Sequence, residues 1–247
     1  MKGRLHQTGR TAAWEAYDVD NGTAPVVLSC EHASVELPDG YRWSSVDAWL
    51  VGTHWCYDIG AAELARDLAT ALGCPAVFAN FSRLICDPNR VLDSPTLFRR
   101  VAEGRPVDLN RKLTDLERAA RVDRFYHPYH ERLEAAVAAR PGAAVLAVHT
   151  FTPVFEGERR HLEVGVLFDR DEGMASEVTR ALVARGVGAR PNEPYSGRHG
   201  MMFSAQHHAD RHGRAALELE VRQDLVEDPG WRERFVRLTR EALVEVL

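Results

Sequence analysis

The 247-residue sequence has no long apolar segment, because its longest purely apolar run, residues 143–148, is six residues long. A membrane-spanning helix needs roughly 20 such residues, so we expect no transmembrane span. The first residues are partly basic but have no apolar stretch behind them, which argues against a secretory signal. We therefore expect a cytoplasmic protein with no membrane partner.

The sequence also has few cysteines and no excess of positive charge. The four cysteines, Cys30, Cys56, Cys74 and Cys86, lie 26, 18 and 12 residues apart and form no C-x-x-C pair, so a thiolate zinc site or redox motif has little support. We expect these thiols to pack as small hydrophobic groups. The formal net charge of −5 gives no support for binding to nucleic acid or to an anionic membrane.

The composition is that of an ordinary globular protein, with 45% hydrophobic and 27% charged residues. No repeat, low-complexity tract or long linker divides the sequence. We therefore expect one domain that spans residues 1–247.

Short apolar runs alternate with amphipathic patterns along the chain. The strand patterns cover residues 25–30, 76–79, 143–149, 162–168 and 215–222, and the helical patterns cover residues 58–72, 114–139, 173–185 and 231–246. Glu117 and Thr114 form a potential capping box, and Pro128 predicts an interruption of the second helix. This alternation indicates an α/β fold with a mainly parallel sheet covered on both faces. In such a sheet the site lies at the carboxyl ends of the strands.

Histidines stand at the ends of two of these strands. His32 follows the strand at 25–30, and His149 comes at the end of the strand at 143–149. Because both strands are expected to end at one edge of the sheet, the two imidazoles predict a common metal site. The alternative is a pair of hydrogen-bonded histidines in the core or in loops.

The sequence offers more than one candidate for the third metal ligand. Asp58 begins the helical pattern at 58–72, where an aspartate is either a helix cap or a ligand that turns into the cleft. Glu36, four residues after His32, is a rival ligand, and Glu31 is another.

The segment after the strand at 76–79 is rich in arginine and asparagine. Asn89 and Arg90 suit an anionic group of a substrate, because a guanidinium donates a planar pair of hydrogen bonds to a carboxylate. Arg83 is a candidate to polarise a carbonyl oxygen. The alternative is a surface loop with a local salt bridge between Asp87 and an arginine.

Two acidic residues share one face of the late strand, because Glu218 and Glu220 are two positions apart. A carboxylate beside a metal site can act as a general base. The alternative is that this alternating strand has one face in solvent.

Other polar segments are ambiguous. His127 with His130, and His208 with His212, have the spacing of helical metal pairs, but neither forms an H-E-x-x-H motif, and we expect both to be structural or peripheral. The proline- and glycine-containing segment 191–197 predicts a shaped turn with Tyr195 exposed, either as a substrate-facing lid or as a tight connection.

Together these segments resemble the N-formylglutamate amidohydrolase family, in family order over about residues 25–226. The blocks that carry the resemblance are Cys30-Glu-His-Ala-Ser with Pro38, Asp58-Ile-Gly-Ala, Ser82-Arg-Leu with Asp87-Pro-Asn-Arg, His127-Pro-Tyr-His, Val148-His-Thr-Phe-Thr-Pro, Asn192-Glu-Pro-Tyr-Ser-Gly and Glu220-Val-Arg-Gln-Asp-Leu.

The resemblance implies a fold similar to that of zinc carboxypeptidases, a three-layer α/β/α sandwich around a mixed sheet. It also implies roles for particular residues. Zn²⁺ would be held by His32, His149 and Asp58, the general base would be Glu220, the carbonyl would be polarised by Arg83, and the substrate carboxylate would be bound by Asn89 and Arg90.

The chain departs from the related patterns at two positions. Val35 stands where the carboxypeptidase pattern has its acidic ligand, three residues after the first histidine, and Gln223 stands where the amidohydrolase pattern commonly has asparagine.

The activity implied by the resemblance is metal-dependent cleavage of the amide C–N bond of N-formyl-L-glutamate, which gives formate and glutamate. The expected partner is therefore a small N-acyl amino acid. Tyr195, Arg198 and Arg222 are candidates to contact it. The alternatives are another N-acyl amino acid or a short peptide as substrate, or an inactive protein that binds carboxylate ligands. The sequence does not set the oligomeric state.

Overall fold

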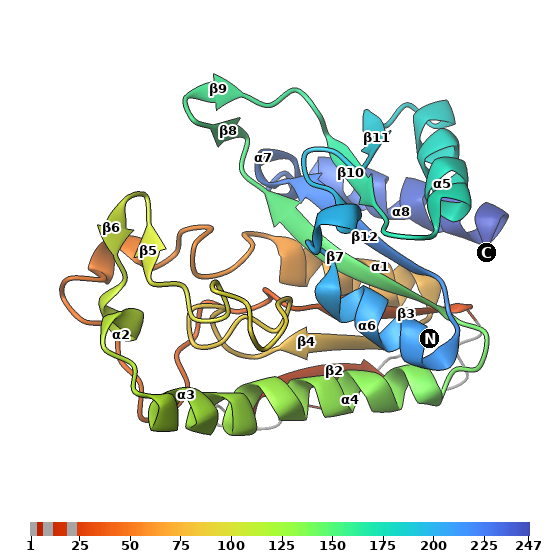
Figure 1. Ribbon diagram of the computed structural model, residues 1–247. Coiled ribbons are helices and arrows are strands. Elements are labelled where there is room, and N and C mark those ends of the chain that lie inside the picture. Colours follow the sequence, from red (N-terminus) through yellow and green to blue (C-terminus); the bar gives the residue numbers. More distant parts are fainter. Residues whose placement is uncertain (1–3, 7–11, 19–23) are drawn as a thin grey trace.

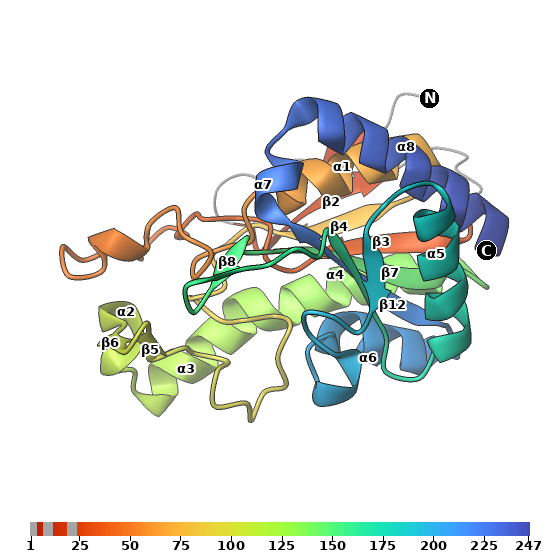
Figure 2. The same cartoon turned by 90° about the horizontal axis from the view of Figure 1, so that it is seen from above.

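The protein folds around an eight-stranded mixed sheet that lies between layers of helices (Figures 1 and 2). The computed structural model describes residues 4–6, 12–18 and 24–247. The strands of the sheet are β1 Arg4–His6, β2 Trp14–Asp18, β3 Val26–Cys30, β4 Ala76–Ala79, β7 Ala144–Phe151, β10 Val164–Leu167, β11 Ala189–Pro191 and β12 Ala216–Arg222. Their order is β1-β2-β4-β3-β7-β12-β10-β11.

The centre of the sheet is parallel. Strands β4, β3, β7 and β12 all run in one direction, whereas β2 and β10 pair antiparallel with β4 and β12. The register places Glu220 of β12 between His149 of β7 and Gly165 of β10. The predicted α/β fold with a mixed, mainly parallel sheet is therefore confirmed.

Helices cover both faces of the sheet, as Figure 2 shows from above. One layer contains α1 Ala61–Leu72, α5 Glu172–Ala184 and α8 Pro229–Val246, and the other contains α4 His127–Ala138 and α6 Phe203–His212. The shorter helices are α2 Asp108–Arg111, α3 Asp115–Arg121 and α7 Gln223–Val226. Two hairpins, β5 Val101–Ala102 with β6 Arg105–Pro106 and β8 Val154–Phe155 with β9 Glu158–Arg159, extend beyond the sheet (Figure 1). None of the helices in the described ranges is long and apolar enough to cross a membrane.

Each face of the sheet has its own apolar core. Residues such as Leu64, Val178 and Phe235 fill the core under α1, α5 and α8. On the opposite face, Tyr129 and Leu133 pack with the residues of α6. Both faces of the central strands are buried, as is typical of a parallel sheet between helices.

Several local predictions agree with the structure. Strands β3 and β4 and helices α5 and α8 lie within two residues of the predicted bounds. Thr114 and Glu117 form the capping box of α3, and a π-helical turn, Val122–Tyr126, separates α3 from α4, in which Pro128 lies in the first turn. All four cysteines are free and buried.

Three local predictions were wrong or incomplete. Helix α1 begins at Ala61 and its N-cap is Gly60, so Asp58 precedes the helix and does not cap it with its side chain. Strand β12 has no wet face, because all seven of its residues are buried. Helix α6 was missed, since its sequence contains few apolar residues and three histidines.

Gly165 of β10 is a position where the fold leaves no space for a side chain. A Cβ atom here would lie far inside van der Waals contact with the backbone carbonyl oxygen of Glu193, in the loop that carries Tyr195. We expect Gly165→Ala to lower the free energy of unfolding by roughly 1–3 kcal/mol, because backbone must shift to relieve the overlap. Denaturant titration measures this change.

The matched control is Gly173→Ala in α5, where a Cβ atom meets nothing within 4 Å. Because alanine favours a helix over glycine by about 1 kcal/mol, this variant should be as stable as the wild-type protein or more stable. Equal stability of the two variants would contradict the assignment of Gly165.

His130 couples the packing of α4 against α6 to pH. Its Nδ1 lies 2.9 Å from Nε2 of His208, whose Nδ1 lies 2.7 Å from Oε2 of Glu134. Burial, and next the charge of His208, lower the pKa of His130 from 6.5 to about 3. The unfolded chain therefore binds an extra proton between these values, and this contribution to stability, complete above pH 6.5, is lost as the pH falls towards 3.

The variant His130→Gln should remove up to about 1.4 kcal/mol per pH unit from the slope of unfolding free energy against pH in this window. Urea titrations from pH 7 to pH 4 measure the slope. An unchanged slope would show that His130 does not carry the coupling.

Candidate active site and metal centre

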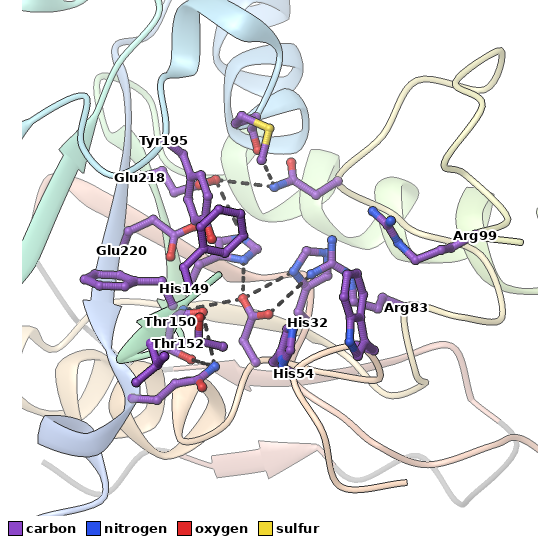
Figure 3. Close-up of a pocket in the computed structure, with 18 of the residues that line it drawn as sticks. His32, His54, Arg83, Arg99, His149, Thr150, Thr152, Tyr195, Glu218 and Glu220 are labelled. Atoms are coloured by element: carbon purple, nitrogen blue, oxygen red, sulfur yellow. Dashed lines mark hydrogen bonds and ion pairs between the residues drawn. The ribbon is translucent and has the colours of Figure 1, made fainter. Parts of the chain in front are cut away.

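A cavity of about 700 Å³ opens at the carboxyl ends of the central strands, within the usual range of small-molecule pockets. Its lining comes from β7, β12, the segments after β3 and β4, and residues of both hairpins (Figure 3). The lining residues are His32, His54, Trp55, Asp58, Arg83, Asn89, Arg90, Arg99, Glu103, His149, Thr150, Phe151, Thr152, Val154, Phe155, Glu156, Tyr195, Met201, Glu218, Glu220 and Gln223.

The predicted convergence of His32 and His149 is confirmed. Their ring centroids are 4.6 Å apart, and the rings are nearly perpendicular. Both Nδ1 atoms approach the same atom, Oδ2 of Asp58, at 3.3 Å from His32 and 2.8 Å from His149 (Figure 3). The ligand atoms of the three residues lie within 4.8 Å of one another. Two nitrogens and one carboxylate oxygen are a suitable donor set for a catalytic zinc ion.

The structure separates Asp58 from the rival ligands. The backbone N–H of Asp58 donates to the carbonyl oxygen of His32 at 2.9 Å, which ties the two segments together and directs the carboxylate into the cavity. Glu36 is exposed and lies outside the lining of the cavity. Glu31 lies behind His149 and does not belong to the convergent group.

Carboxylates hold the far side of each imidazole ring. Oδ1 of Asp87 lies 2.8 Å from Nε2 of His32, and Oε2 of Glu31 lies 2.9 Å from Nε2 of His149. Such partners fix the orientation of a metal-binding histidine and increase its basicity. Sequence reasoning missed both roles. Glu31 is next to His32 in the sequence, but only the tertiary structure shows that its carboxylate contacts the ring of His149.

The electrostatics of this cluster favour positive charge between the carboxylates. Burial alone would raise the pKa of Asp58, but the charge of His32 and the hydrogen bond from His149 outweigh it and hold this pKa below its usual range. For Glu31, burial is likewise outweighed by His149, which lowers the pKa to about 2. Burial would lower the pKa of His149, but Glu218, Asp58 and Glu31 raise it. These observations fit a site for a cation.

Arg83 reaches the same cluster from the segment after β4. Its guanidinium donates to Oδ2 of Asp87 at 2.8 Å and to Oδ1 of Asp58 at 3.4 Å. The salt bridge to Asp87, considered from the sequence as a surface feature, is therefore internal and belongs to the site. A guanidinium has five N–H donors, so Arg83 retains donors for a substrate in the cavity.

Asn89 and Arg90 also line the cavity. The side chain of Asn89 donates to the carbonyl oxygen of Met201 at 2.8 Å and accepts from the backbone N–H of Ser204 at 3.0 Å. It thus joins this segment to the start of α6. Arg90 donates to the carbonyl oxygen of Asn89 and is also one of the residues that line the cavity.

Glu218 and Glu220 extend from β12 into the cavity on the same side (Figure 3). Oε2 of Glu218 lies 3.6 Å from Nε2 of His149, and burial is the main cause that raises the pKa of Glu218 to about 7. Burial and the charge of Glu218 raise the pKa of Glu220 as well. Oε2 of Glu220 is buried and has no hydrogen-bond partner among the described residues.

The remaining candidates lie in different places. Tyr195, which was predicted to be exposed, is instead half-buried at the cavity wall, where its hydroxyl accepts from Arg160 at 3.2 Å. Arg222 is buried outside the lining of the cavity, where it donates to three backbone carbonyl oxygens and to Asp224. Arg198 is exposed and pairs with Glu172 at 2.7 Å.

The other histidine pairs do not form a common ligand group. His130 contacts His208 across the α4–α6 interface, and His208 and His212 both contact Glu134. Among the described residues, the single group found with converging ligand atoms is His32, Asp58 and His149.

Comparison with known proteins places these residues in a family context. The model of the N-formylglutamate amidohydrolase family matches residues 24–227. A solved gene product from Agrobacterium tumefaciens is 29% identical, with a TM-score of 0.88 over 96% of this chain and 95% of that chain. An N-formylglutamate amidohydrolase from Ralstonia eutropha JMP134 is 21% identical and shares the fold, with a TM-score of 0.72 over 95% of this chain and 98% of that chain. No curated protein matches the sequence.

The ligand assignment can be tested by titrating chelator-treated protein with Zn²⁺ in a calorimeter. We expect one ion per chain, and we expect Asp58→Ala to weaken its binding at least tenfold because one of the three donors is lost. The matched control is Glu36→Ala, which removes an exposed carboxylate close in sequence to His32. The assignment fails if Glu36→Ala weakens binding and Asp58→Ala does not.

Proposed function

Since the chain belongs to the N-formylglutamate amidohydrolase family, we propose that it is a metal-dependent hydrolase that cleaves the amide C–N bond of N-formyl-L-glutamate or a similar N-acyl amino acid. The observation that carries this proposal is the convergence of His32, Asp58 and His149 beside a buried carboxylate, Glu220, whose Oε2 has no hydrogen-bond partner among the described residues. A potential metal site next to a carboxylate that can transfer protons is one arrangement that supports hydrolysis of an amide.

The residues that would hold the cation are His32, Asp58 and His149. When bound, a divalent cation supplies polarisation of the acyl oxygen, a lower pKa for a water molecule beside it, and a positive field that favours the ionised form of Glu220. Zinc fits the two nitrogens and one oxygen of this donor set.

Glu220 is the proposed general base and acid. Its carboxylate accepts a proton from the attacking water as the new C–O bond forms at the acyl carbon. It then returns that proton to the amide nitrogen as the C–N bond breaks, which releases the acid and the free amino acid. A buried carboxyl group with a raised pKa suits the proton transfer to the amide nitrogen, because its protonated form is favoured.

Arg83 and Arg90 are the proposed contacts for negative charge. Arg83 lies against Asp58, so its remaining N–H groups are positioned to donate to the oxyanion that develops at the acyl group. Arg90, next to Asn89 on the cavity wall, is placed to bind the substrate α-carboxylate. Tyr195 also lines the cavity.

Formate release from N-formyl-L-glutamate by zinc-loaded protein tests this function. We expect Glu220→Gln to lower kcat by about 10²–10⁴-fold, the usual contribution of a general acid–base group, with substrate affinity changed only a few-fold. Affinity is measured separately by calorimetry. The control is Glu177→Gln, which makes the same chemical change at an exposed position on α5.

A variant Glu220→Gln with kcat within tenfold of wild type would remove Glu220 from the mechanism. A panel of N-formyl, N-acetyl and peptidyl glutamates determines the acyl group. If the wild-type protein binds these compounds and hydrolyses none, it is a binding protein that shares the family's cavity.

A further inference from the structure

The cavity contains two cations, Arg90 and Arg99, that have no ion pair with a carboxylate among the described residues. Three arginines line it, namely Arg83, Arg90 and Arg99. Arg83 is paired with Asp58 and Asp87. The guanidinium of Arg99, in contrast, has no hydrogen bond or ion pair to any carboxylate in the part of the chain that the structure describes, although it is partly buried.

Arg99 is nevertheless held in a defined place. Its guanidinium lies over the ring of Trp55, 5.1 Å from the centroid, and the indole Nε1–H of Trp55 donates to Oε1 of Glu103 at 3.1 Å. The backbone of Arg99 is also fixed, because its carbonyl oxygen accepts a hydrogen bond at 2.9 Å from the buried side chain of Asn110. Arg121 in turn donates to Asn110 at 2.7 Å.

The electrostatic surroundings leave Arg99 short of negative charge. Burial, and next the charge of Arg83, lower its pKa, and Arg90 acts in the same direction. Asp87 opposes these effects, but its carboxylate already contacts Arg83 and His32. An anionic group that entered the cavity would therefore find a positioned guanidinium with free N–H donors.

Two other arginines considered from the sequence, Arg198 and Arg222, do not present free N–H donors to the cavity. Arg222 is occupied by backbone carbonyl oxygens and lies outside the lining of the cavity, and Arg198 is exposed and paired with Glu172. In Figure 3, Arg99 lies on the side of the pocket opposite Glu218 and Glu220, beyond His32 and Arg83. A substrate whose amide lies at the histidine pair would thus extend its far end away from the two glutamates.

We propose that Arg99 is a specificity-determining residue that binds the side-chain carboxylate of an acidic N-acyl amino acid, while Arg90 takes the α-carboxylate. This inference rests on the proposed function, and what it adds is the assignment of the side-chain carboxylate to Arg99. A guanidinium held over an indole ring can donate two parallel hydrogen bonds to a carboxylate, whereas a lysine at the same place would act only as a point charge.

The test compares two substrates that differ only in this charge, N-formyl-L-glutamate and N-formyl-L-glutamine. We expect Arg99→Met to lower kcat/KM for the glutamate derivative about 10- to 100-fold, mainly through KM, since a charge-assisted hydrogen-bonded pair is lost. The value for the glutamine derivative should change less than threefold. Arg99→Lys should recover part of the loss for the glutamate derivative.

The matched control is Arg100→Met, which removes the same charge at the neighbouring, exposed position. This variant should leave kcat/KM unchanged for both substrates. If Arg99→Met lowers kcat/KM equally for both substrates, or for neither, Arg99 does not select the side chain.

A direct binding measurement separates this inference from the proposed reaction. Calorimetry with glutarate and with its monoamide, glutaramate, requires no turnover. We expect the wild-type protein to bind glutarate at least tenfold more tightly than glutaramate, and Arg99→Met to remove most of this preference. If the protein releases no formate but shows this preference, the proposed function fails and the dicarboxylate subsite stands. If formate is released and the preference is absent, the subsite fails and the function stands.

Discussion

The site depends on one carboxylate oxygen that two histidines share. Oδ2 of Asp58 lies close to Nδ1 of both His32 and His149, although the three residues come from different parts of the chain. This arrangement is costly unless charge is balanced, because all three groups are buried. Glu31, Asp87 and Arg83 supply that balance from outside the triad, and the rest of the cavity is built around the result.

The sheet explains how such distant residues meet. Parallel strands β3, β7 and β12 end at the same edge, so the segment after β3, the end of β7 and the inward face of β12 form one surface. The register places Glu220 directly beside His149. A shift of a single residue would turn both glutamates of β12 to the other face of the sheet, and the cluster would lose its acidic wall.

Sequence reasoning was most successful where a local pattern has one physical meaning. Apolar runs identified the central strands, and the end of a buried strand identified His32 and His149. It was least successful where the partner lies far away in sequence. The burial of β12 could not be predicted from Glu218 and Glu220, since an alternating strand usually has a solvated face, and here α6 and the cavity cover it. Likewise Arg99 lies 20 residues beyond the end of β4, and only the folded structure places it in the cavity beside Trp55.

We propose that His32, Asp58 and His149 form the ligand set of one cation. X-ray absorption spectroscopy at the zinc edge, on protein loaded with one equivalent of Zn²⁺, reports this set directly. We expect scattering from nitrogen and oxygen at about 2.0–2.2 Å, including the outer-shell pattern of two imidazole rings. Sulfur at about 2.3 Å, or a spectrum without imidazole, would contradict it, because the ion would then lie elsewhere in the protein.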